Sequence, residues 1–323
     1  MLVTLNRMLE RALPFLTPIA VIIGVWLSSF YSNYVFLVPY IFAFITFASS
    51  LAISPKDIRN IIHYPMPILT SMIILQVIMP LVAFGVGHLF FSGNFETITG
   101  LLLAFTIPTG VVTLMWVSIY NGSRSLTLAI ILINTLLSPF IVPFTLNLLI
   151  GGSISMDTWG VMSGLIMMVM LPSAVGILVN YLRKGKIMTM SKSLAPFAKL
   201  SLLTVIMLNG SIVAPYLSSI DSNVVRIFLV VLLLAISGYL VGFLTSRRLG
   251  FSAETSISIM YNCGMRNIGA GAAIAVVYFP PAVSLPVIMG TLFQQILAAL
   301  FGKVISKRLK RDLPNMNESI EAK

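Results

Sequence analysis

Long apolar runs separated by short polar connections fill almost the whole sequence. Each run has about 20 or more mainly hydrophobic residues, the length that an α-helix needs to cross a bilayer. The pattern therefore predicts ten transmembrane helices. They cover residues 12–31, 34–53, 66–91, 96–120, 125–150, 158–182, 193–217, 224–246, 252–278 and 282–305.

Basic residues in the connections give these helices an orientation. With the N-terminus in the cytoplasm, 18 of the 20 lysines and arginines fall on the cytoplasmic side, and only Arg226 and Arg266 do not. Cytoplasmic loops carry such an excess of basic residues. Because one helix more or fewer would destroy the asymmetry, we expect ten helices with both termini in the cytoplasm. The connections that carry these charges include Arg7 and Arg11, Lys56 and Arg59, Arg124, Lys184 and Lys186, and Lys199.

Two of the predicted helices contain a polar interruption at matching positions. The fourth is interrupted at Pro108-Thr109-Gly110, and the ninth at Gly264-Met265-Arg266-Asn267, about 155 residues later. Each is the fourth helix of a set of five. Because five is an odd number, the second set enters the membrane from the opposite side. Paired interruptions of this kind point to a transporter binding site. We expect two inverted five-helix repeats, residues 1–153 and 154–306, and a charged cytoplasmic tail, 307–323.

Composition agrees with an all-α polytopic membrane protein. The 323 residues are 58% hydrophobic and 9% charged, whereas soluble domains have about 25% charged residues. The net charge of +11 comes from the connections, so it indicates orientation and not nucleic-acid binding. One cysteine, Cys263, and two histidines, His63 and His88, supply no metal-binding motif and no activated nucleophile. We expect no enzyme, no metal and no cofactor.

Arg266 is the only ionisable residue that the pattern places near the middle of the membrane. A lone arginine there costs at least about 2.5–3.5 kcal/mol on insertion scales. Either its guanidinium satisfies carbonyls freed by the helix break, or it faces a cavity and attracts an anionic substrate. A carboxylate would be bound bidentately.

The residues around the two interruptions have structural and functional readings. Pro108-Thr109-Gly110 forms a proline kink or the mirrored half of a binding site, and Asn262 and Asn267 cap broken helix ends or contact substrate. Gln76, shortly before Pro80, makes a structural hydrogen bond or belongs to the site. The predicted substrate site comprises Arg266, Asn267, Asn262, Pro108, Thr109, Gly110 and Thr113. For Asn134, Thr135, Ser138, Asn209, Ser211, Gln294 and Gln295 we favour helix packing.

The chain resembles the bile acid:sodium symporter family. The resemblance is carried by residues 264–267 with the small residues that follow to Ala275, by Pro108-Thr109-Gly110, and by Thr135, Ser138 and Pro139 in the fifth helix. It implies a core domain and a panel domain, with broken helices four and nine crossing at the substrate site. It also implies transport of organic anions by alternating access, driven by two sodium ions.

The sequence departs from the family pattern at the sodium sites. The acid that bridges both sites falls on Asn262, and the following glutamine falls on Arg266. An asparagine of the fourth helix becomes Leu114, and a hydroxyl of the fifth becomes Ile131. The ion-site positions carried over are Gln76, Thr113, Leu114, Thr127, Ile131, Asn262, Cys263, Met265 and Arg266. Because a fixed positive charge replaces an oxygen ligand, we expect neither sodium site to operate.

These observations favour a secondary carrier of small organic anions in the cell membrane, with Arg266 in place of the bound cation charge. A sodium symporter with relocated ligands, such as backbone carbonyls, Asn262 and Asn267, remains an alternative. A membrane sensor that transports nothing is a third reading, against which the lack of any long loop argues.

Overall fold

The computed structural model describes residues 2–53, 64–152, 154, 156–183, 187–217 and 221–321. Of the residues in the predicted connections and tail, Lys56, Arg59, His63, Lys184, Lys186 and Lys323 lie outside these ranges. Within them every named element is a helix, and β-type pairing is limited to one isolated bridge.

The helices follow the predicted apolar runs closely. The first half contains α1 (Leu2–Trp26), α2 (Ser28–Tyr31), η1 (Ser32–Leu37), α3 (Val38–Ser50), α5 (Pro65–Ile73), η3 (Ile74–Ile78), α6 (Met79–Phe90), α7 (Phe95–Thr106), α8 (Thr113–Ile119) and α9 (Arg124–Ile150). The second half contains α10 (Thr158–Leu165), η4 (Ile166–Met170), α11 (Leu171–Leu182), α12 (Met188–Leu217), α13 (Ser222–Arg248), α14 (Ala253–Gly264), α15 (Ile268–Tyr278) and α16 (Pro281–Glu321).

Seven continuous helical stretches of the described chain are long and apolar enough to cross a membrane. An eighth is α1, if its two parts, Thr4–Glu10 and Ala12–Trp26, form one span across a bend of 67°. The other two predicted helices are each split, and their more apolar halves, α7 and α15, have only 12 and 11 residues. The chain is therefore a multi-pass helical membrane protein.

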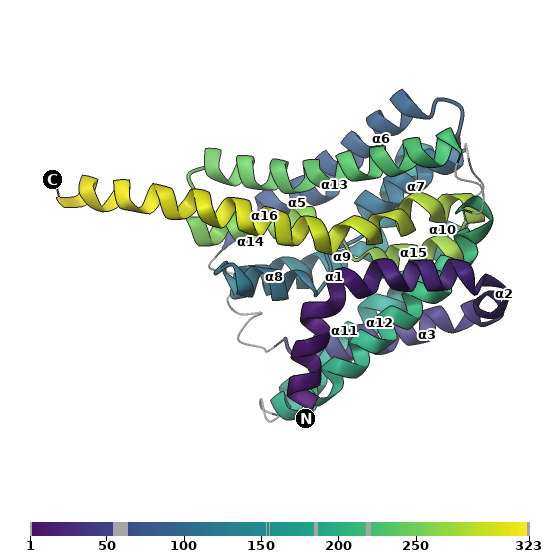
Figure 1. Cartoon of the computed structure of the whole chain (residues 1–323), viewed down its shortest axis with the longest axis horizontal. Helices are drawn as coiled ribbons and strands as arrows, with labels where there is room; N and C mark the ends of the chain where they lie inside the picture. The colour runs from purple at the N-terminus through teal and green to yellow at the C-terminus, as the bar shows by residue number, and fades with distance from the viewer. Residues whose placement is uncertain are drawn as a thin grey trace.

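Two helices extend beyond the predicted membrane spans. α1 begins at Leu2, but the part after its bend, Ala12–Trp26, begins where the span was predicted. α16 continues to Glu321, whereas its candidate span, Pro281–Ile305, ends at the predicted residue. The first part of the added segment, residues 306–312, contains lysine, arginine and leucine, which have good helix propensity. Figure 1 shows α16 projecting beyond the other helices.

The outer surface is apolar, as expected for a protein solvated by lipid. Trp26, Leu89 and Phe15 are among the most exposed side chains, at 81%, 75% and 73%. Monomeric soluble proteins rarely show extended apolar surfaces of this kind. Polar side chains such as Gln76, Asn134 and Asn262 are buried between the helices, where groups of neighbouring helices can hydrogen-bond to them.

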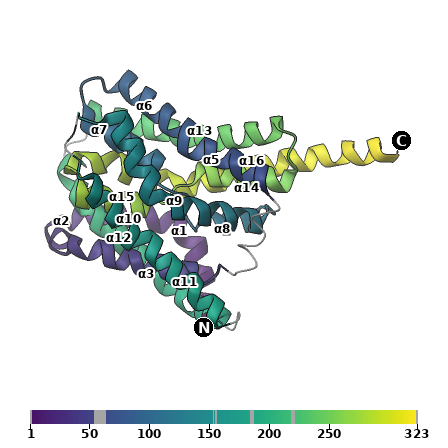
Figure 2. The same cartoon turned by 180° about the vertical axis from the view of Figure 1, so that it is seen from behind.

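The helices form two packed groups. α1, α3, α11 and α12 pack against one another, and α6, α7, α13, α14, α15 and α16 form a second group. Both views place α3, α11 and α12 on one side of the molecule and α6 and α13 on the other (Figures 1 and 2). α15 and α16 contact α12 across the boundary, and the candidate site lies there.

Candidate functional site

Both broken helices end for local reasons. Ile107, at the end of α7, precedes Pro108 and has extended dihedral angles (φ −56°, ψ 149°), because a proline disfavours the α conformation of the residue before it. In the second break Met265 is extended (φ −110°, ψ 123°). Asn267 then caps α15, since its side-chain oxygen accepts a hydrogen bond from the Ala270 N–H at 3.4 Å.

The two breaks meet and are joined by hydrogen bonds. Thr109 and Arg266 form the isolated antiparallel bridge, and the Asn267 N–H donates to the Pro108 carbonyl at 2.7 Å. The Thr109 hydroxyl donates to the Met265 carbonyl at 2.9 Å. A Cβ atom on Gly110 would lie 3.3 Å from the Arg266 carbonyl oxygen, so the glycine permits this close approach. Residues 156 positions apart thus form one crossing point.

Arg266 is 3% exposed and ties the crossing to a third helix. Its Nη1 donates to the carbonyls of Leu75 at 3.3 Å and Ile107 at 3.4 Å. The Ile107 carbonyl is at the end of α7. Leu75 lies in the π-helical segment η3, where its usual donor five residues later is Pro80, which has no N–H. The arginine therefore satisfies two carbonyls that helix breaks leave without their usual donors.

The remaining edge of the guanidinium has no partner. The Nε and Nη2 atoms of Arg266 are buried and make no hydrogen bond. Among the described side chains, no carboxylate lies within 4.0 Å of the Arg266 guanidinium. The ion pair of the described residues, Lys199 with Glu10, lies elsewhere. A buried charge without a counter-ion costs free energy, which an anion can remove. Nε and Nη2 lie along one edge of the planar guanidinium group, and two parallel N–H groups on such an edge can pair with a carboxylate.

Asn262 and Gln76 take part in separate buried contacts. The Asn262 Nδ2 donates to the Thr127 hydroxyl at 3.2 Å and to the Ser258 carbonyl at 2.8 Å, while its Oδ1 has no partner. Gln76 is hydrogen-bonded through Nε2 to Asn134 Oδ1, and the other amide atoms of this pair are unpartnered. The first contact joins an amide to a hydroxyl and a backbone carbonyl, the second joins two amides, and neither includes a carboxylate.

The other positions aligned with the family's sodium sites offer few side-chain oxygens. Leu114 and Ile131 have apolar side chains, so they offer none. Thr113 is buried with its hydroxyl 3.3 Å from that of Thr109. Cys263 and Met265 are buried in the main hydrophobic core. The side-chain oxygens at the aligned positions are thus the amide oxygens of Gln76 and Asn262 and the hydroxyls of Thr113 and Thr127, with no carboxylate.

A cavity of about 100 Å³ adjoins the crossing, between the two helix groups. Of the predicted substrate residues, Thr109, Gly110, Arg266 and Asn267 line it. Asn262, Pro108 and Thr113 do not line it, and all three are buried elsewhere around the crossing.

The opposite wall of the cavity was missed by the sequence reasoning. It contains Thr46, Ser49 and Ser50 of α3, with Ser173 of α11, whose hydroxyl accepts a hydrogen bond from Ser50 at 3.2 Å. Positions 46, 49, 50 and 53 share one helical face, and that spacing is a signal that could have found them. Thr135, Gln294 and Gln295, for which packing was favoured, also line the cavity.

Comparison with known proteins identifies the family. The model of the Sodium Bile acid symporter family matches residues 39–222. The protein YbaS of Bacillus subtilis, described as uncharacterized, is 46% identical over 91% of this chain and 97% of its own length. A second relative, the uncharacterized sodium-dependent transporter YocS of Bacillus subtilis, is 24% identical over 89% of this chain and 92% of its own length.

A plant relative is more distant. The probable sodium/metabolite cotransporter BASS1, chloroplastic, of Arabidopsis thaliana is 26% identical over 83% of this chain and 65% of its own length. The matched family consists of transporters and not of enzymes. On the family match and the near-full-length similarity to YbaS, the chain belongs to the Sodium Bile acid symporter family.

Proposed function

We propose that the protein is a secondary transporter of small organic anions that binds its substrate beside the crossing of the two broken helices. The observation that carries the proposal is the buried Arg266 guanidinium, held through Nη1 while its Nε and Nη2 have no partner. Arg266 lines the cavity at the crossing. The substrate's negative charge offsets the buried positive charge, so anions are selected over neutral or cationic solutes.

Two further features favour an anion. α15 begins at Ile268, next to Asn267 and the cavity, and a helix N-terminus carries a partial positive charge. The rest of the cavity wall is made of hydroxyl, amide and apolar side chains. Such a wall suits a small organic acid with a polar head and an apolar body.

We infer that Arg266 replaces the charge of a bound cation. Asn262 is neutral, and the carbonyls of Leu75 and Ile107 already have Arg266 as their donor. Two like charges about 4 Å apart repel by about 4 kcal/mol at an effective dielectric constant near 20. A sodium ion at the second site would therefore compete with the arginine. Neither family-type sodium site operates in this proposal.

The proposed architecture has ten spans in two inverted five-helix repeats, residues 1–153 and 154–306. α7 with α8 and α14 with α15 are then the broken fourth and ninth spans, and their meeting across 156 residues supports the repeat. The group of α1, α3, α11 and α12 is the panel, and the second group is the core. Alternating access arises when the panel moves against the core. We place the protein in the cell membrane with both termini, including residues 307–323, in the cytoplasm.

A ligand-binding screen tests the proposal. Thermal unfolding of the purified protein is measured with a set of small carboxylates and sulfonates, in sodium and in choline buffer. An organic anion should stabilise the protein equally in both buffers. Arg266→Gln should lose that stabilisation while remaining folded. Arg226→Gln is the matched control, because Arg226 also donates to a backbone carbonyl, that of Phe90 at 3.3 Å, but lies away from the cavity.

The relatives' names favour a second candidate, a sodium-coupled symporter with relocated ligands. YocS is described as sodium-dependent, and BASS1 as a probable sodium/metabolite cotransporter. Backbone carbonyls at the breaks, with Asn262 and Asn267, would then hold the ion. Uptake into proteoliposomes separates the two: a requirement for a sodium gradient supports this candidate and overturns the sodium-independent one.

A further inference from the structure

A second, larger cavity lies next to the one at the crossing. It has a volume of about 690 Å³ and is lined by the start of α1, the end of α3, α8, Arg124 at the start of α9, and the first half of α12. Ile45, Ser49, Val111, Val112 and Leu202 line both cavities, so the two cavities are neighbours separated by these residues. We call the larger cavity the vestibule.

The vestibule carries a positive charge. Among the described residues, its lining contains three basic side chains, Arg7, Arg124 and Lys199, and one acidic side chain, Glu10. Arg7 and Arg124 are exposed, and neither has an ion-pair partner among the described residues. Lys199 is paired with Glu10 at 3.1 Å. The two unpaired arginines therefore determine the sign of the field in the vestibule.

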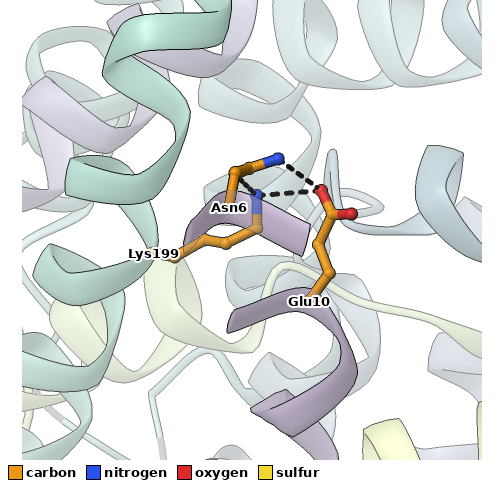
Figure 3. Close-up of polar contacts among 3 residues, drawn as sticks. All are labelled: Asn6, Glu10 and Lys199. Carbon is orange, nitrogen blue, oxygen red and sulfur yellow. Dashed lines mark hydrogen bonds and ion pairs between the residues drawn. The ribbon is translucent and has the colours of Figure 1, made fainter. Parts of the chain in front are cut away.

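Asn6, Glu10 and Lys199 form a closed polar cluster that fixes one wall (Figure 3). Asn6 Nδ2 donates to Glu10 Oε1 at 2.9 Å, and Lys199 donates to Asn6 Oδ1 and to the same carboxylate oxygen. The cluster joins the first part of α1 to α12. Arg7 lies between Asn6 and Glu10 in the sequence, so the cluster holds the segment that carries Arg7 at the vestibule.

The first part of α1 is amphipathic, which explains its angle to the rest of the helix. Leu5 and Met8 are 40% and 64% exposed, and they lie on the side opposite the polar cluster in helical projection. A helix with one apolar and one polar face is stable in the plane of the membrane interface, with its apolar face in lipid. The polar face of this segment is then free to line the vestibule.

We propose that Arg7 and Arg124 form an anion-capture site in the vestibule, which concentrates small organic anions before they reach the crossing. The class of ligand is a small organic anion, recognised by charge, because neither guanidinium group has an ion-pair partner in the part of the chain that the structure describes. The biological role of this site rests on the proposed transport of anions. Its charge selectivity does not, and it can be measured without knowing the substrate.

Trp116 provides the measurement. The chain has three tryptophans, of which Trp26 and Trp159 are 81% and 71% exposed on the outer surface, whereas Trp116 lines the vestibule. In a Trp26→Phe/Trp159→Phe background, fluorescence quenching of Trp116 by iodide is compared with quenching by caesium. Each quenching constant is divided by that for free N-acetyltryptophanamide. At low ionic strength we expect the normalised iodide-to-caesium ratio to exceed one by about threefold or more, and to fall toward one in high salt.

Charge variants assign the effect to the vestibule. Arg7→Gln and Arg124→Gln, singly and together, should lower the ratio, and Glu10→Gln should raise it, since glutamine keeps an oxygen for the cluster. Arg247→Gln is the control, because Arg247 lies in the last turn of α13 and does not line the vestibule. A ratio near one, no change in the arginine variants, or an equal loss in Arg247→Gln would overturn the proposal. A selective vestibule in a protein that binds no organic anion would refute the proposed function alone.

Discussion

The hydroxyl of Thr109 should be a main link between the two broken helices. It is 1% exposed, donates to the Met265 carbonyl at 2.9 Å and lies 3.3 Å from the Thr113 hydroxyl. Thr109→Val keeps the shape of the side chain but removes this donor. A hydrogen bond in the interior is worth about 0.5–1.5 kcal/mol, and membrane proteins average about 0.6 kcal/mol. Because the buried Met265 carbonyl also loses its partner, we expect Thr109→Val to lower the free energy of unfolding by about 1–2 kcal/mol.

Thr106→Val is the matched control for that measurement. Thr106 is equally buried, and its hydroxyl donates at 2.7 Å to the Leu102 carbonyl of its own helix, which the helical N–H of Thr106 also serves. Thr106→Val should therefore lower the free energy of unfolding by less than about 0.5 kcal/mol. The assay is reversible unfolding of the purified protein in mixed micelles, with Thr109→Ser expected to restore most of the stability. Equal losses in the two valine variants would show that the crossing does not depend on this hydroxyl.

Two further predictions concern packing and ion coupling. A Cβ atom on Gly100 of α7 would lie 2.4 Å from the Val283 carbonyl oxygen of α16, whereas one on Gly85 of α6 meets nothing within 4 Å. Gly100→Ala should thus destabilise the protein by about 1–3 kcal/mol, and Gly85→Ala should be neutral or stabilising by up to about 1 kcal/mol, as measured by thermal unfolding. The double variant Asn262→Glu/Arg266→Gln restores the acid and the glutamine of the family pattern. It should make the unfolding temperature rise with sodium but not with choline, and no sodium effect would contradict our account of these two positions.

The helix breaks could be predicted because their causes are local. Pro108 forces Ile107 out of the helical conformation, and Asn267 caps the helix that follows it. The matching positions of the two breaks in the two five-helix sets predicted that they serve one site, and the bridge between Thr109 and Arg266 brings them together. Apolar run length likewise predicted most helix boundaries to within a few residues.

The partners of the site could not be predicted, because they depend on how distant helices pack. Nothing in the sequence near Arg266 indicates that the Leu75 carbonyl is its acceptor; that contact requires the π-helical segment η3 to face the crossing. The cavity wall from α3 and α11 also depends on the second helix group. The bend in α1 was hidden because its first part is too short and too polar to count as a membrane span.

The two readings of Arg266, structural and substrate-binding, use different atoms and are therefore compatible. Nη1 satisfies the carbonyls of Leu75 and Ile107, which fixes the position of the guanidinium plane. Under the proposed function, a guanidinium held along one edge presents Nε and Nη2 in a constant direction, so an anion would bind without a large loss of side-chain entropy. A sodium ion at this place would attract the same carbonyls and the same anion, but it would dissociate in each transport cycle. Because the arginine stays, we expect that the free energy of a sodium gradient is not applied at this site.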